Sequence, residues 1–150
     1  MAVLRERPYP DFNFLVDLGA GNTEALLAGF EEVILPEAWF DVFEYRNGNE
    51  KENEVRKLTG LSHCGNLVLK RGVIGSLDLY QWFNDVRNGN QGALRSVTVQ
   101  LMTEDRSAVV QTWKFQRARP VRLKWGPLHG RGREPLVEYL ELAVERLEME

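Results

Sequence analysis

The stretch Phe12-Asn13-Phe14-Leu15-Val16-Asp17-Leu18 sets the pattern of this chain. Apolar side chains recur at every second position from Phe12 to Leu18, and a period of two is typical of a strand with one buried face. Similar apolar or alternating runs return along the sequence. They predict further strands at 38–45, 55–58, 67–72, 96–102 and 108–115, and a second apolar run at 25–30. The chain is therefore predicted to be mainly β.

Turns and one helix separate these runs. Gly19-Ala20-Gly21-Asn22 and 104–107 are predicted turns, and 45–53 is a polar loop. Between Ser76 and Asn88 the apolar residues stand at the i, i+3, i+4 and i+7 spacing of one helical face: Leu79, Trp82, Phe83 and Val86. Ser76 can cap the start and Asn88-Gly89 can end the segment, so a helix over 76–88 is predicted.

The segment 136–147 fits two patterns. Leu136, Tyr139 and Leu140 begin a helical spacing, whereas Leu140, Leu142 and Val144 alternate as in a strand. Local propensity favours the helix, because Leu, Glu, Ala and Arg are good helix formers. The pattern itself leaves both structures open.

Length and composition fit one globular domain. The chain has 150 residues, 43% hydrophobic and 27% charged, with a formal net charge of −3. We expect a single domain over 1–150 with a short flexible N-terminus at about 1–10. No run approaches the ~20 apolar residues that span a bilayer, so the monomer is not expected to insert into a membrane. The single cysteine, Cys64, cannot form an internal disulfide, which favours a reducing compartment.

The sequence offers little chemistry for catalysis. His63 and Cys64 are the one candidate base and nucleophile, but neighbours on an extended chain point to opposite faces. Cys64 is therefore interpreted as a small buried or semi-buried residue. Gly19-Ala20-Gly21 lacks the third glycine of a dinucleotide-binding loop, and the Cys and His residues are too few for a typical zinc set. We expect no catalytic residue, no cofactor, no metal and hence no enzyme.

Charge is arranged in three blocks. Residues 28–54 carry eight acidic and two basic residues, 106–133 carry eight basic and no acidic ones, and 134–150 carry six glutamates and one arginine. One interpretation is a surface of separated signs that meets copies of itself head to tail. The other is that adjacent strands neutralise one another within the sheet. A nucleic-acid groove is disfavoured, since such domains usually carry a strong positive excess.

An ordered series of short motifs runs from Asp11 to Glu148. The most distinctive is Asn66-Leu67-Val68-Leu69-Lys70-Arg71-Gly72, which precedes the helix that bears Trp82. The others are Phe12-Asn13-Phe14-Leu15-Val16, Gly29-Phe30-Glu31-Glu32-Val33, Glu44-Tyr45-Arg46-Asn47-Gly48, Lys57-Leu58-Thr59-Gly60, Trp113-Lys114-Phe115 with Ala118-Arg119-Pro120, and Val137-Glu138 with Leu140-Glu141-Leu142. In this order and spacing they resemble the tail-tube family of contractile phage tails and related bacterial contractile injection systems.

The resemblance implies an antiparallel two-sheet β-barrel with one flanking helix at about 76–88. It also implies that the final segment is a strand, against its local propensity. The positions that carry the family signature are Phe12, Phe14, Lys70, Arg71, Gly72, Trp82, Trp113 and Pro120.

The resemblance further implies a structural role. Six copies would form a ring, and rings would stack into a tube that conducts DNA or an effector protein. Expected partners are other copies, sheath and baseplate proteins, and a tail terminator or tape-measure-type protein. Assembly would take place in the bacterial cytoplasm, before the tube becomes part of a phage tail or injection particle. The loop 45–57 would reach an adjacent ring, and the suspected interface residues are Tyr45, Arg46, Asn47, Gly48, Arg131, Arg133 and Glu138.

Two connecting segments depart from the family pattern. Ile34-Leu35-Pro36-Glu37-Ala38 replaces a small glycine-containing turn, and His129-Gly130-Arg131-Gly132-Arg133 is unusually basic. They favour, as an alternative, a specialised tube protein such as an initiator or adaptor ring next to the baseplate. A less favoured alternative, from another class, is a monomeric β-barrel that binds a small ligand.

Overall fold

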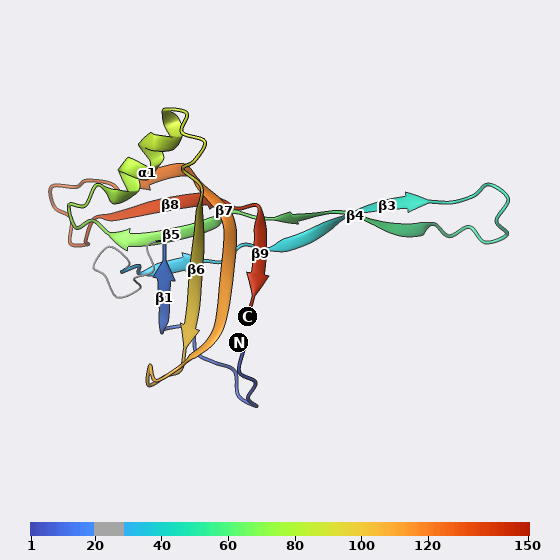
Figure 1. The fold of residues 1–150 in the computed structure, drawn as a ribbon, viewed down its shortest axis with the longest axis horizontal. Coiled ribbons are helices and arrows are strands. Elements are labelled where there is room, and N and C mark those ends of the chain that lie inside the picture. The colour runs from blue at the N-terminus through green and yellow to red at the C-terminus, as the bar shows by residue number, and fades with distance from the viewer. Residues whose placement is uncertain (20–28) are drawn as a thin grey trace.

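One long strand, β7 (Val109–Trp125), belongs to both sheets of this fold. The structure is a computed structural model that describes residues 1–19 and 29–150. The first half of β7 pairs with β6 (Arg95–Met102), and its second half pairs with β8 (Val137–Ala143). Figure 1 shows β7 curving from the first group of strands into the second.

The two sheets have the strand orders β1-β6-β7-β9 and β7-β8-β5-β2, and every pairing is antiparallel. The remaining strands of these sheets are β1 (Phe14–Asp17), β2 (Glu32–Ile34), β5 (Leu67–Gly72) and β9 (Arg146–Met149). The predicted mainly β fold with two antiparallel sheets is confirmed. Among the described residues the hydrogen-bonded path ends at β1 and at β2 and does not close on itself.

A bend in the backbone lets β7 change sheets. Arg117 has a φ of 51°, and the register with β6 shifts at this point, between the pairs Arg95–Ala118 and Val97–Phe115. Such irregularities bend a strand and allow it to leave one sheet and join the next. A second register shift lies between Pro120 and Arg122.

The predicted end of this strand at 115 was therefore wrong. Pro120 lies inside β7, where the ladder is already irregular, and that is where a sheet tolerates proline. The predicted strand at 55–58 was also too short, because β4 continues to Cys64.

The core lies between the sheets and follows the period of two. In β5 and β8 every second side chain is buried, and Leu67 and Leu69 stand opposite Leu142 and Leu140. Side chains of the first sheet face them: Val16, Val97, Val99 and Phe115. The final segment thus forms strands β8 and β9, as the resemblance implied, and the helix favoured by local propensity was wrong.

Among the described residues one helix, α1 (Asp78–Arg87), covers one end of this core. Trp82 is 1% exposed, and its Nε1 donates a hydrogen bond to the carbonyl of Ala93 at 2.6 Å. The guanidinium carbon of Arg95 lies 4.5 Å from the centre of the Trp82 ring. The ring is therefore both packed and hydrogen-bonded.

The helix ends are close to the predicted ones. Leu77, rather than Ser76, is the N-terminal cap residue, and Ser76 Oγ accepts a hydrogen bond from the Asp78 backbone N–H at 3.3 Å. The helix ends at Asn88, followed by Gly89 with a φ of 84°. The turn predicted at 19–22 and the apolar run at 25–30 fall largely on residues 20–28, outside the described residues.

A buried ion network joins the helix to the second sheet. Arg71 is 1% exposed; its Nε donates to Glu138 Oε1 at 2.5 Å, and its other nitrogens bind the Asp78 carboxylate. Burial alone would raise the pKa of Asp78, but hydrogen bonds from Arg71 and Ser76 hold that pKa below its ordinary value. The network thus contributes stability that is present above the ordinary Asp pKa and is lost as pH falls through the lowered one.

Trp82→Ala should lower the free energy of unfolding by roughly 3–5 kcal/mol, because it empties a buried aromatic site and leaves the Ala93 carbonyl without its donor. Urea unfolding followed by circular dichroism measures the loss. Phe83→Ala, on the less buried flank of the same helix, is the control. A Trp82 variant as stable as the wild type would contradict this packing.

Glu138→Gln should destabilise the fold by about 3 kcal/mol, since it leaves the buried Arg71 guanidinium without its full counter-charge. Glu141→Gln is the matched control, because Glu141 lies on the other face of β8 and accepts from Asn66. Its expected effect is below about 0.5 kcal/mol. Equal losses of unfolding free energy in the two variants would show that the network is not a stabilising element.

Candidate assembly interface

A two-stranded arm projects from the body. It consists of β3 (Ala38–Tyr45), the loop 46–55 and β4 (Arg56–Cys64), and β3 begins and ends where the sequence predicted. Within the part of the chain that the structure describes, these two strands pair only with each other. Figure 1 shows the arm extending far beyond the sheets. A hairpin of this kind is marginally stable by itself in water and needs other surfaces to pack against.

The arm exposes apolar side chains on both of its faces. Phe40 is 60% exposed and Leu61 is 73% exposed. The other large apolar residues of the arm with more than a third of their surface exposed are Trp39, Val42, Phe43, Tyr45, Val55 and Leu58. Monomeric proteins rarely leave a contiguous apolar surface of this kind, so the arm has the character of a protein–protein interface.

Cross-strand contacts give the arm its own order. The Phe43 ring lies over Gly60, where an added Cβ would clash with Phe43 Cε2. Trp39 stacks on His63 with ring centres 5.3 Å apart, and His63 Nε2 lies 2.8 Å from Asp41 Oδ2. Gly60, singled out within the Lys57–Gly60 motif, thus makes room for an aromatic ring.

The tip of the arm contains the predicted interface residues 45–48. Arg46 donates to the backbone carbonyls of Glu50 and Glu52, at 2.9 and 3.0 Å, and Asn47 Nδ2 donates to Glu50 Oε1 at 3.3 Å. Arg46 and Asn47 therefore shape the tip, while Tyr45 remains half exposed. Nothing lies within 4 Å of a Cβ built at Gly48, so this position is open to a neighbour.

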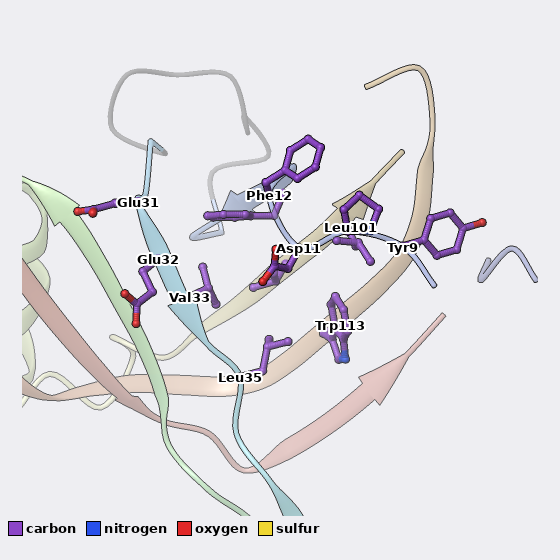
Figure 2. Close-up of a pocket in the computed structure, with 12 residues that line it drawn as sticks. Tyr9, Asp11, Phe12, Glu31, Glu32, Val33, Leu35, Leu101 and Trp113 are labelled. Atoms are coloured by element: carbon purple, nitrogen blue, oxygen red, sulfur yellow. The ribbon is translucent and has the colours of Figure 1, made fainter. Parts of the chain in front are cut away.

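A groove of about 470 Å³ opens between the edge strands β1 and β2 (Figure 2). Its apolar lining consists of Phe12, Phe14, Val33, Leu35, Val99, Leu101 and Trp113, and its acidic residues are Asp11, Glu31 and Glu32. Figure 2 shows Leu35 and Trp113 on opposite sides of the hollow. The groove is an end of the space between the two sheets that the described residues leave unfilled.

No local sequence pattern predicts the groove, because the residues that line it are far apart in the sequence. Val33 belongs to β2 and Leu35 follows that strand, whereas Leu101 belongs to β6 and Trp113 to β7. The one sequence feature that points to this region is the segment Ile34-Leu35-Pro36-Glu37-Ala38, which departs from the family pattern and contributes Leu35 to the groove. Phe12 and Trp113, proposed as family-signature residues, both line this hollow.

Part of the charge segregation is neutralised inside the subunit. Lys114 pairs with Glu150 at 2.7 Å, and Glu145 binds both Arg117 and Arg119. Arg56 pairs with Glu50 at 3.1 Å across the arm tip. The interpretation that adjacent strands compensate one another therefore describes three of the eight residues of the basic block, Lys114, Arg117 and Arg119. The other five make no ion pair with any described residue: Arg106, Arg122, Lys124, Arg131 and Arg133.

The other proposed site residues have separate places in the fold. Lys70 lies 3.9 Å from Glu31, Gly72 ends β5, and Pro120 is buried in β7. Arg131 and Arg133 are exposed in the loop between β7 and β8. Glu138 is 6% exposed and is bound to Arg71, so we leave its side chain out of the proposed interface.

The described residues do not assemble a recognisable reaction centre. Burial raises the pKa of the Cys64 thiol, which disfavours the thiolate form needed by a nucleophile. No group of three or more His, Cys, Asp or Glu side chains within residues 1–19 and 29–150 could hold a metal ion. Among the same residues, no helix is long and apolar enough to cross a membrane.

Known proteins match this chain over both its sheets and its arm. A family model described as T4-like virus tail tube protein gp19 matches residues 10–148. A solved chain from the PVC sheath-tube complex of an extracellular contractile injection system, in the extended state, is 25% identical, with a TM-score of 0.83 over 97% of this chain and 93% of that one. A chain of the anti-feeding prophage baseplate is 27% identical, with a TM-score of 0.81 over 97% of both chains.

More distant structures share the fold alone. Hcp1 from Flavobacterium johnsoniae is 16% identical, with a TM-score of 0.53 over 91% of this chain and 93% of that one. No curated protein sequence matches the chain.

Leu61→Ser on the arm should weaken self-assembly while leaving the monomer fold intact. An exposed side chain contributes little to folding, but burying a leucine in a contact is worth enough to raise the concentration needed for assembly about tenfold or more. Sedimentation velocity measures assembly, and thermal unfolding checks the fold. Leu128→Ser is the control, because Leu128 is also well exposed but lies outside the arm. Similar assembly of both variants would argue against the arm as an interface.

Proposed function

This chain belongs to the family of T4-like virus tail tube proteins and is a structural inner-tube subunit; we propose that it assembles into stacked hexameric rings that form the conduit of a contractile tail or injection system. The observation that carries the proposal is the match of nearly the whole chain, arm included, to a chain of a sheath-tube complex. The tube would conduct DNA or an effector protein through its lumen.

The surface features of the subunit support self-assembly. β1 and β2 are sheet edges with no strand beyond them in the described chain, and exposed edges pair readily with other strands. The arm adds an apolar surface that a neighbouring subunit can cover. Contacts between different patches of identical subunits generate closed rings or helical stacks, and both are needed for a tube.

The mechanism in this proposal is mechanical and involves no catalytic residue. The tube would be a stiff conduit because antiparallel ladders tie together both sheets and the arm of each subunit. Sheath, baseplate and cap proteins are the proposed partners, since solved relatives come from a sheath-tube complex, a baseplate and a tube-terminating cap. A tape-measure-type protein is a further proposed partner. The tube would assemble in the bacterial cytoplasm before it becomes part of the particle.

A second candidate function is an initiator ring next to the baseplate. The similarity to a chain of the anti-feeding prophage baseplate favours it, as does the exposed basic loop with Arg131 and Arg133. Under this proposal the loop would bind a baseplate protein, and Arg131→Glu would weaken binding to the baseplate without affecting stacking of tube rings.

Electron microscopy of the concentrated protein tests the main proposal. We expect six-fold rings or tubes, alone or with sheath and baseplate proteins, and a hexamer or larger species in sedimentation. A stable monomer that binds a small molecule and forms no ring under any of these conditions would instead favour a ligand-binding β-barrel.

A further inference from the structure

We propose that the pocket beside the loop 126–136, which joins β7 to β8, binds an acidic segment of another protein. The segment would bring carboxylates and at least one apolar side chain to this pocket. The inference deepens the second candidate function, on which its biological setting rests, because it names the chemistry that the basic loop would bind. The pocket shares no lining residue with the arm or with the groove between β1 and β2.

The pocket has a volume of about 430 Å³ and is bounded by the loop and by the start of β8. Its apolar lining consists of Pro127, Leu128, Pro135, Leu136 and Val137. Leu128 is 86% exposed, so the described residues leave a large apolar side chain in water at this site. A partner that covers it gains free energy in proportion to the apolar area removed from water.

Hydrogen bonds within the loop hold its shape. The Gly132 backbone N–H donates to the His129 carbonyl at 2.9 Å, and the Arg131 backbone N–H donates to His129 Nδ1 at 3.1 Å. An added Cβ at Gly132 would lie 3.1 Å from that carbonyl oxygen, so a glycine lets the turn close. Pro127 and Pro135 restrict the backbone near the two ends of the loop. A loop that is ordered in advance loses less conformational entropy when a partner binds.

Unpaired cations give the pocket a positive charge. Arg133 lines it, Arg131 belongs to the same loop, and Lys124 is the residue before the end of β7. None of these three makes an ion pair with any described residue, and neither does Glu134, the acid in the lining. Three cations against one acid leave a local excess of positive charge. The pocket therefore favours a partner that brings carboxylates.

Tyr139 lies between two lysines at the inner side of the pocket. It is the register partner of Lys70 on β5 and of Lys124 on β7. The two Nζ atoms lie 5.7 and 5.5 Å from the centre of its ring. Lys70 also lies 3.9 Å from Glu31, so Lys124 is the lysine that remains available for a partner.

The glutamates of β8 do not cancel this charge. Glu138 is buried and bound to Arg71, and Glu141 accepts a hydrogen bond from Asn66 at 3.1 Å. His129 adds a donor, because an Nδ1 that accepts a hydrogen bond leaves the ring proton of the neutral form on Nε2. Arginine, lysine and a histidine N–H are all donors to carboxylate oxygens.

An acidic protein segment matches these features better than a nucleic acid does. Single strands are usually held by free aromatic faces on which the bases stack, whereas the ring of Tyr139 is flanked by lysines. The net charge of −3 also opposes the approach of a polyanion. An apolar pocket with cations beside it instead matches a peptide that carries both leucine-like and acidic side chains.

The occupant is assigned to another protein rather than to a second copy. The segment 129–133 is one of the two places where the sequence departs from the family pattern. A contact that every tube subunit makes with its own copies would not depend on such a segment. Figure 1 shows the loop at the end of the sheets away from the arm, so a partner can bind here while the arm is engaged elsewhere.

Fluorescence anisotropy tests the pocket in the full chain, with a short labelled peptide of alternating glutamate and leucine as the probe. We expect this peptide to bind about tenfold more tightly than the same peptide with glutamine in place of glutamate. An oligothymidylate of similar length is the nucleic-acid probe and should bind more weakly than the acidic peptide. No preference for the glutamate peptide, or tighter binding of the oligothymidylate, would overturn the inference.

Charge reversal locates the binding. Arg133→Glu should lower the affinity for the glutamate peptide about tenfold, because it reverses a charge in the lining of the pocket. Arg106→Glu is the matched control, because Arg106 is also exposed and without an ion pair among the described residues, but lies between β6 and β7. It should change the affinity less than about twofold. Equal losses in the two variants would reveal a general effect of net charge and overturn the inference.

Sedimentation velocity separates a partner protein from a second copy. We expect Arg133→Glu to assemble at the same concentration as the wild type while it loses the peptide. Weakened assembly of this variant would assign the loop to a contact between copies and overturn the inference. Wild-type protein that forms no tube would overturn the proposed function, whereas the peptide titration would still decide this inference.

Discussion

The bend of β7 at Arg117 is the constraint on which the rest of the subunit depends. One strand completes both sheets, so the position of its bend fixes how the sheets face each other and how much core lies between them. The buried network of Arg71, Asp78 and Glu138 then ties β5, α1 and β8 together on the second sheet. Because β7 joins the sheets at one side only, the described residues leave a groove at the other side, between β1 and β2.

That open side and the projecting arm explain why the subunit is incomplete by itself. The groove is interior space that the subunit's described residues leave unfilled, and the arm is apolar surface that the same residues leave uncovered. Edges and apolar patches of this size are liabilities for a monomer, yet in a closed assembly each becomes a contact. The fold is therefore better understood as a repeating unit than as a free domain.

The sequence predicted the elements well where local pattern and tertiary structure agree. The aromatic run at 38–45 and the helix near Trp82 are of this kind. It misled at 136–147, because β8 lies between β5 and β7 and its two hydrogen-bonded ladders outweigh helix propensity. The arm could be predicted as a strand and a loop, but a period of two suggests one buried face. Nothing local in the sequence indicates that Phe40 and Phe43, on opposite faces, are both exposed.

The charge pattern needed the structure for its interpretation. Some residues of these oppositely charged blocks pair across adjacent strands, such as Lys114 with Glu150, so part of the segregated charge is neutralised within the subunit. Many charges make no ion pair among the described residues, including two acids at the groove, Glu44 and Lys57 on the arm, and five residues of the basic block. Exposed ion pairs contribute little free energy, whereas buried apolar area contributes much more. Apolar contacts of the arm would therefore drive assembly, and the unpaired charges would help to orient those contacts.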